Sequence, residues 1–150
     1  MRYTMLAQTH KGFFIIGTDT GVGKTVVSAA LLIMLARHGF KTAAIKPIAS
    51  GGLQNSDALI LQKYATHKMK YVQINPFAFA EPIAPHIAAA KTGIELTTTG
   101  ILAKIKPALS SNVDYIVIEG AGGLCVPLNT QETMADLIKA INYGSVTSFL

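Results

Sequence analysis

A glycine-rich segment at residues 17–25, GTDTGVGKT, contains the residue types that bind phosphate. A glycine-rich turn between a strand and a helix directs backbone N–H groups and the positive end of the helix toward one place. Gly23 lets the backbone approach a ligand closely, Lys24 can reach the β- and γ-phosphates, and the hydroxyl of Thr25 can bind magnesium. The segment therefore predicts a loop that binds a magnesium nucleotide.

The spacing of this loop departs from the usual GxxxxGK[ST] pattern by one residue. Counting back five residues from Gly23 gives Thr18, so the leading glycine is Gly17. An apolar run at residues 13–16 and a long apolar segment after the loop make a chance match much less probable, because the pattern requires a strand before it and a helix after it. The alternative is a glycine turn with an exposed lysine. Asp19 and Thr20 lie inside the loop, where their side chains can face a substrate rather than the nucleotide.

A second lysine, Lys46, ends the apolar segment KTAAIK and is followed by PIASGG. A cation at this position would lie near the γ-phosphate or neutralise a negative charge on a substrate. The alternative is an ordinary lysine at a strand end in solvent. Ser50, in the same loop, can hydrogen-bond a substrate amine or carboxylate.

Two acidic residues complete the candidate site. Asp57 opens a helical pattern, where an aspartate is most often a cap or a partner of the helix dipole, although it can also hold magnesium. Glu119 ends the apolar strand YIVIE, a common position for the second anchor of magnesium in proteins with such a loop. A buried carboxylate without a partner is costly, and magnesium prefers oxygen ligands. Thr25, Asp57 and Glu119 therefore supply the types of oxygen ligand that magnesium prefers.

These residues must be positioned by the elements around them. Strands are predicted at residues 13–16, 41–46 and 114–118, and helices at 24–38, 57–65, 83–91, 98–110 and 132–141. Residues 47–56 are predicted to form a loop, and residues 67–81 an irregular or weakly extended segment. The alternation predicts a single α/β domain with a parallel sheet flanked by helices. Ligands bind at the carboxyl ends of such strands, so the loops at 17–24, 46–56 and 119–125 should converge.

Composition narrows the class of protein. Half of the 150 residues are hydrophobic and the mean hydropathy is +0.39, which supports a folded core. The net charge of +5 suits an anionic small ligand, since no basic run interleaved with aromatic residues indicates nucleic acid. One cysteine excludes an internal disulfide and favours a reducing compartment. The longest apolar run, residues 29–36, is too short to cross a bilayer, and we expect a cytoplasmic protein without membrane contact.

Several motifs together resemble the dethiobiotin synthetase family of P-loop NTPases. They are GTDTGVGKT, KPIASG, NSDALILQ, NPFAFAEPIAPHIAA and IEGAGGLCVPL, in matching order and spacing over about residues 12–141. The resemblance implies a ligase of biotin biosynthesis, which uses ATP and magnesium to join CO2 to 7,8-diaminononanoate and close a ureido ring. It also implies a homodimer with sites near the subunit interface.

The resemblance assigns roles to residues of this chain. The ATP phosphates would be held by Gly21, Val22, Gly23, Lys24, Thr25 and Val26, and the cleft would be lined by Glu119, Gly120, Ala121 and Gly122. Lys46 and Lys24 would be catalytic, and Ser50 and Thr20 would touch the diamine or its carbamate. Magnesium would be bound by Thr25, Asp57 and Glu119.

The C-terminal segment departs from the family. Family members continue beyond the helix at 132–141 into a further buried strand and into elements for adenine recognition and dimer contact, whereas residues 142–150, NYGSVTSFL, are atypical. We expect a truncated chain whose sheet is incomplete on the C-terminal side, with an unpaired edge.

Two alternatives stay open. One is a P-loop switch ATPase that acts through a protein partner; the lack of a lysine at residues 18–22 (TDTGV) counts against it. The other is a truncated, non-catalytic remnant that binds nucleotide or nothing. Diamine-dependent ATP hydrolysis separates the first hypothesis from the switch ATPase, and a cooperative thermal transition separates both from an unfolded fragment.

Overall fold

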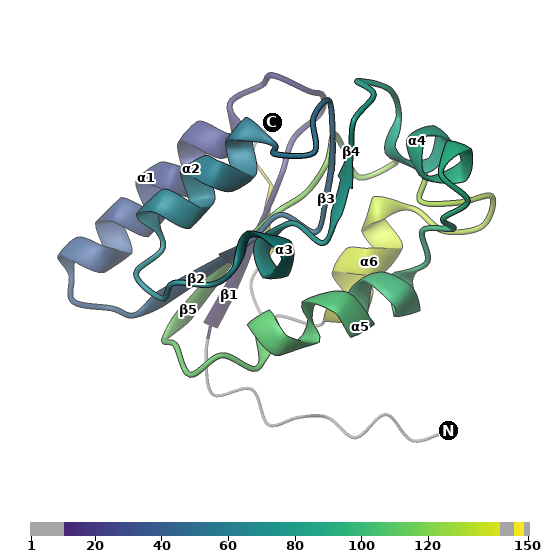
Figure 1. The fold of residues 1–150 in the computed structure, drawn as a ribbon. Coiled ribbons are helices and arrows are strands. Elements are labelled where there is room, and N and C mark those ends of the chain that lie inside the picture. Colours follow the sequence, from purple (N-terminus) through teal and green to yellow (C-terminus); the bar gives the residue numbers. More distant parts are fainter. Residues whose placement is uncertain (1–10, 142–145, 149–150) are drawn as a thin grey trace.

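The structure is a computed structural model that describes residues 11–141 and 146–148. A central sheet carries helices on both faces (Figure 1). The strands are β1 (Lys11–Ile16), β2 (Thr42–Ile45), β3 (Ile48–Ser50), β4 (Phe77–Phe79), β5 (Tyr115–Glu119) and β6 (Val146–Ser148). The helices are α1 (Lys24–Arg37), α2 (Ser56–Tyr64), α3 (Tyr71–Ile74), α4 (Pro85–Lys91), α5 (Thr98–Leu109) and α6 (Met134–Ile141).

The main sheet is parallel throughout, in the order β2-β5-β1-β6. The register places Ile15 beside Glu119 and Ile45 beside Ile118, so the ends of the three predicted strands lie at one edge. Because parallel strands have their carboxyl ends together, the loops after them emerge on the same side. The predicted α/β fold with a parallel sheet flanked by helices is confirmed.

Side chains of the strands alternate between two apolar cores. Ile15, Ala44 and Val117 pack toward α1 and α2, with Leu32 and Leu61 among their partners. Their neighbours in sequence point to the opposite face, where α5 and α6 contribute to the larger core; these neighbours are Phe14, Ile16, Ala43, Ile45, Ile116 and Ile118. Both faces of the sheet are buried, which explains why the predicted strands appear as continuous apolar runs rather than as an alternation of polar and apolar residues.

The expectation that residues 142–150 add no strand to the sheet is wrong at residues 146–148, although the sheet still ends there, at β6. Residues 146–148 form β6, which pairs in parallel with Phe14–Ile16 of β1. The N–H and C=O groups at this edge of β1 offer a template on which a further strand can pair. The rest of the segment predicted to be atypical, residues 142–145 and 149–150, lies outside the described residues.

Two segments expected to be irregular contain regular structure. Within 47–56, β3 pairs in parallel with β4, and within 67–81 the short helix α3 precedes β4. These elements have three or four residues each, too few to display a period in the sequence. The predicted helices after them are confirmed as α4 and α5, with slightly different ends. None of the described helices has both the length and the apolar character needed to cross a membrane.

Candidate functional site

The loop between β1 and α1 has the backbone that its glycines predict. Gly21 and Gly23 adopt positive φ angles of 77° and 99°, a region that other residues occupy only with strain. Gly23 is the N-cap of α1 and offers no side chain to its first turn. The N–H groups at the start of α1 are therefore left for an external acceptor such as a phosphate.

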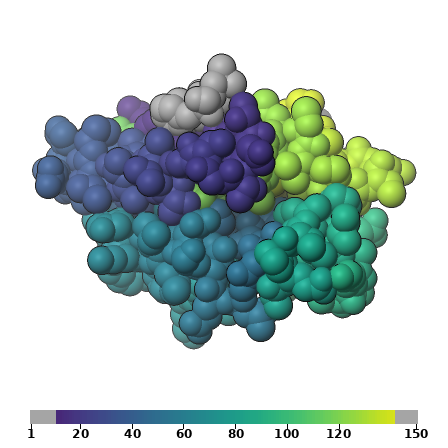
Figure 2. Space-filling model, turned by 90° about the horizontal axis from the view of Figure 1, so that it is seen from above, coloured from purple at the N-terminus to yellow at the C-terminus, as the bar shows by residue number. Residues whose placement is uncertain are grey.

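The three strand-end loops converge as predicted. They border a cavity of about 360 Å³ that opens beside the phosphate loop. From above, the part of the chain near residue 20 (indigo) meets the blue-to-teal segment of residues 46–85 along this hollow (Figure 2). Its lining is Thr20, Gly21, Gly23, Lys24, Thr25, Val26, Lys46, Ile48, Ala49, Ser50, Asn55, Asp57, Glu119, Gly120, Ala121 and Gly122. Every predicted site residue except Val22, whose side chain is exposed, lies on this lining.

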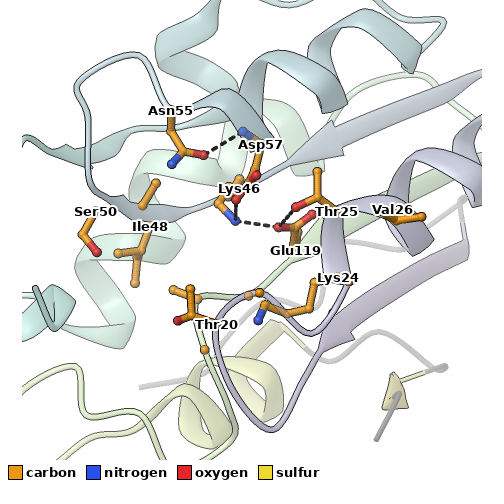
Figure 3. Close-up of a pocket in the computed structure, with 16 residues that line it drawn as sticks. Thr20, Lys24, Thr25, Val26, Lys46, Ile48, Ser50, Asn55, Asp57 and Glu119 are labelled. Atoms are coloured by element: carbon orange, nitrogen blue, oxygen red, sulfur yellow. Dashed lines mark hydrogen bonds and ion pairs between the residues drawn. The ribbon is translucent and has the colours of Figure 1, made fainter. Parts of the chain in front are cut away.

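A cluster of charged residues, of which Lys46 and Glu119 are buried, lines the cavity (Figure 3). The Nζ of Lys46 lies 2.6 Å from Oε1 of Glu119 and 3.2 Å from Oδ2 of Asp57. The hydroxyl of Thr25 donates to the same Glu119 oxygen at 2.9 Å. Lys46 is 5% exposed and Glu119 0%. The alternative of a strand-end lysine in solvent is therefore wrong for Lys46.

Glu119 keeps one oxygen without a partner. Its Oε2 is buried and accepts no hydrogen bond from any described residue. Such an atom is costly unless a further group pairs with it. A cation bound at this oxygen would supply the missing partner.

The donor set fits magnesium better than a metal held by protein alone. The described residues gather no group of three or more His, Cys, Asp or Glu that can hold a metal ion. Glu119 and Asp57 with the hydroxyl of Thr25 supply two carboxylates and one neutral oxygen. Magnesium commonly takes one or two carboxylates and completes its shell with water and substrate phosphates. These residues are therefore suitable for a metal that arrives with a nucleotide.

Asp57 is available for this role because another residue caps α2. Asn55 is the N-cap, and its side-chain oxygen accepts from the backbone N–H groups of Asp57 and Ala58 at 3.1 and 3.2 Å. The Asp57 carboxylate instead reaches Lys46. The interpretation of Asp57 as the cap of this helix is therefore wrong, because Asn55 is the N-cap.

The ammonium group of Lys24 donates to the backbone carbonyl of Asp19 within the phosphate loop. Partial burial lowers the pKa of Lys24 below its ordinary value of 10.5, and the nearby charge of Lys46 lowers it further. Glu119, Asp57 and Asp19 act on this pKa in the opposite direction. An incoming polyphosphate would bring negative charge to a place where two lysines repel each other.

Gly120 is required by close packing where the chain leaves β5. A β-carbon at this position would lie 2.7 Å from Cδ1 of Ile16 and 2.9 Å from Cε1 of Phe14. The backbone N–H of Gly120 donates to the carbonyl of Ile15, and that of Gly17 donates to Gly122. The loop after Glu119 is thereby held against the start of the phosphate loop.

Thr20 and Ser50 line both the main cavity and an adjoining hollow of about 430 Å³. One wall of that hollow is the segment Pro82, Ile83, Ala84 and Pro85, to which the sequence analysis assigned no role. The available signal was the cluster EPIAP, one residue after the short apolar run FAF. The two hollows together offer a polar end beside the lysines and a more apolar end beside the prolines.

A parallel sheet whose strand-end loops surround a glycine-rich turn, a lysine and two acidic residues defines a nucleotide-binding domain with a phosphate loop. The AAA domain family matches residues 11–146, and the chain belongs to that family.

Curated relatives narrow the comparison. The chain is 43% identical to the ATP-dependent dethiobiotin synthetase of Pseudomonas aeruginosa (strain UCBPP-PA14) over 135 residues, which cover 86% of this chain and 59% of that protein. It is 49% identical to the enzyme of the same name from Marinobacter nauticus over 129 residues, covering 82% of this chain and 55% of the relative. The chain thus spans somewhat more than half the length of these relatives. The resemblance to dethiobiotin synthetases that the motifs indicated is confirmed.

Proposed function

We propose that this chain forms the phosphate-, metal- and diamine-binding part of an ATP-dependent dethiobiotin synthetase. One observation carries the proposal: the Lys46 ammonium bridges Glu119 and Asp57 beside the phosphate loop. A cation held there by two carboxylates suits a reaction in which negative charge develops between a nucleotide and a second substrate. The names of the curated relatives support the same reaction.

The proposed reaction has three steps. One amine of 7,8-diaminononanoate attacks CO2 and loses a proton, giving a carbamate. A carbamate oxygen attacks the γ-phosphorus of ATP, ADP leaves, and a carbamic-phosphoric anhydride forms. The second amine attacks the carbamoyl carbon, loses a proton and expels inorganic phosphate, which closes the ureido ring of dethiobiotin.

The phosphate loop would hold ATP for the second step. Backbone N–H groups of the turn from Gly21 to Val26 would bind the phosphates, and the first turn of α1 adds its positive end. Lys24 would exchange the Asp19 carbonyl for phosphate oxygens. Magnesium, held by Thr25, Asp57 and Glu119, would neutralise charge on the phosphates.

Lys46 would stabilise the carbamate and the transferring phosphoryl group. Its ammonium already lies in a site with little access to water, where its charge acts more strongly than in solvent. Glu119 and Asp57 would hold both this ammonium and the metal, each with a different share of their carboxylate oxygens. Oε2 of Glu119 gives the metal a position that Lys46 does not occupy.

The diamine would occupy the adjoining hollow. Thr20 and Ser50 lie where the two hollows meet and would hydrogen-bond the amines or the carbamate. Ile83 and the flanking prolines would pack against the carbon chain. As the sequence resemblance implies, we propose a homodimer at work in the cytoplasm.

The decisive experiment is phosphate release from MgATP by the 150-residue chain, measured with and without bicarbonate and diaminononanoate. We expect release that requires both substrates and disappears in Lys46→Ala. Lys104→Ala, a change at an exposed lysine on α5, is the matched control and should keep full release.

Two results would contradict the proposal. Release that is independent of the diamine would favour the P-loop switch ATPase. No release from a chain with a cooperative thermal transition would favour a non-catalytic remnant.

A further inference from the structure

The side chains of Tyr71 and Asn75, outside the cavity, connect the backbone at Lys46 to the backbone just before Asp57. Tyr71 is the first residue of α3, and Asn75 follows its last residue. Asn75 is 2% exposed, and its side-chain amide donates to the backbone carbonyl of Lys46 at 2.7 Å. The backbone N–H of Lys46 donates to the carbonyl of Ile74 at 2.8 Å. The end of α3 therefore holds both backbone polar groups of Lys46.

The same pair reaches the other end of the loop. The hydroxyl of Tyr71 donates to Oδ1 of Asn75 at 2.9 Å and accepts from the backbone N–H of Asn55 at 2.7 Å. Asn55 is the N-cap that presents Asp57. A chain of hydrogen bonds thus runs from the Lys46 carbonyl through Asn75 and Tyr71 to Asn55.

This series of hydrogen bonds ties together the two ends of the loop that contains Lys46 and Asp57. Residues 46–57 leave β2 and return to α2 with Lys46 and Asp57 facing each other at 3.2 Å. Each polar group in this series is hydrogen-bonded to the next one. Buried polar groups that are paired in this way fix the local geometry, because leaving one of them unpaired is costly. Neither Tyr71 nor Asn75 lines the cavity.

We propose that Tyr71 and Asn75 are positioning residues, which set the distance between Lys46 and Asp57 and so tune metal-nucleotide binding. This inference rests on the proposed function, because it concerns the same metal ligands. Residues that orient metal ligands through hydrogen bonds commonly change metal affinity by about 10- to 100-fold when they are altered.

The test is Tyr71→Phe, which removes one hydroxyl and keeps the ring packed against the core. Binding of Mn²⁺ with ATP is titrated by electron paramagnetic resonance, a readout that does not depend on turnover. We expect affinity to fall roughly tenfold in Tyr71→Phe and in Asn75→Ala. Tyr64→Phe, at a half-buried tyrosine of α2 for which the described residues show no hydroxyl hydrogen bond, is the control and should bind like the original chain.

A double-mutant cycle separates positioning from general stability. In the Asp57→Asn background, Tyr71→Phe should no longer change Mn²⁺-ATP affinity, although it should still lower the melting temperature. Unchanged affinity in Tyr71→Phe, or an equal loss in both backgrounds, would overturn the positioning role. Failure of the unaltered chain to bind Mn²⁺-ATP would instead overturn the proposed function together with the inference that rests on it.

Discussion

Glu119 and Glu132 lie in two regions of the molecule that hold a carboxylate in different ways. Glu119 ends β5, is fully buried, and contacts a positive charge and a hydroxyl. Glu132 precedes α6, and its Oε2 accepts from the backbone N–H of Thr98 at 3.0 Å and from the side-chain amide of Asn129 at 2.8 Å. The first carboxylate pairs with an ion, and the second with neutral donors.

The neighbours of Glu132 form a cluster that caps helices. The side-chain amide of Asn129 also donates to the carbonyl of Leu96 at 2.7 Å, so the loop before α6 is tied to the segment before α5. At the start of α6, Asp136 accepts from the N–H of Thr133 at 2.9 Å and from its hydroxyl at 2.8 Å. Asp136 is therefore one of these capping contacts.

The comparison suggests how a structural carboxylate differs from a functional one. Around Glu132, fixed donors hold the acidic group and add stability without requiring a ligand. Glu119 is buried beside a lysine and has one unpaired oxygen. A buried ion pair of this kind often stabilises a fold less than well-packed apolar residues would at the same positions. Changes in the Glu119 region should therefore affect ligand chemistry most, and changes in the Glu132 region should affect stability alone.

The largest effect is expected for Lys24→Ala. Loss of the cation that we propose to meet the β- and γ-phosphates should lower diamine-dependent phosphate release by about 100- to 1,000-fold. The melting temperature should change little, since Lys24 is only partly buried and its contact is with a loop carbonyl. Phosphate-release kinetics and thermal denaturation of the same samples test both statements, and a large loss of stability would blur the distinction between the two regions.

Glu119→Gln should show that the charge of the site, rather than its shape, matters for function. Phosphate release should fall about 100-fold, because the glutamine cannot supply negative charge to Lys46 and to the proposed metal. The free energy of unfolding should fall by about 3 kcal/mol, since the buried Lys46 loses one of its two carboxylates. Urea denaturation followed by circular dichroism measures this change.

A second substitution sharpens that test. Lys46→Met in the Glu119→Gln background removes a buried charge that has kept only the half-exposed Asp57 as its partner, so stability should recover part of the loss while activity stays absent. A double variant less stable than Glu119→Gln alone would mean that Lys46 stabilises the fold through its packing rather than through its charge.

The two regions also differed in how far the sequence predicted them. Lys24, Lys46, Asp57 and Glu119 were predicted because each follows or opens an element whose type was clear, and because parallel strands end at one edge. Their convergence in one cavity is confirmed, whereas their chemical roles stay predictions.

Other contacts depend on pairs that no local pattern reveals. The links from Asn75 to Lys46 and from Glu132 to Thr98 join residues far apart in the chain, and each depends on the final placement of a short loop. The strand at 146–148 was missed for a similar reason, since its pairing depends on the free edge of β1. Residues of these kinds need tertiary structure to be recognised.

The smallest effect is expected for Glu132→Gln. The substitution replaces a charge-assisted pair of hydrogen bonds with weaker neutral ones, so the free energy of unfolding at pH 7 should fall by about 1 kcal/mol. Diamine-dependent phosphate release should be unchanged. If a fully folded Glu132→Gln variant lost phosphate release, the Glu132 region would affect function as well as stability, contrary to this comparison.

The pH dependence of the stability lost in Glu132→Gln tests whether the charge of Glu132 causes that loss. The backbone N–H of Thr98, and then the amide of Asn129, hold the pKa of Glu132 below its ordinary value of 4.5. A carboxyl whose pKa is lowered by folding stabilises the protein above its unfolded pKa, and the contribution is lost as pH falls through the folded pKa. The stability difference between the original chain and Glu132→Gln, measured by urea denaturation, should therefore be full at pH 6 and should shrink below pH 4.5. A difference that stays constant down to about pH 3 would mean that the two forms differ in packing rather than in charge.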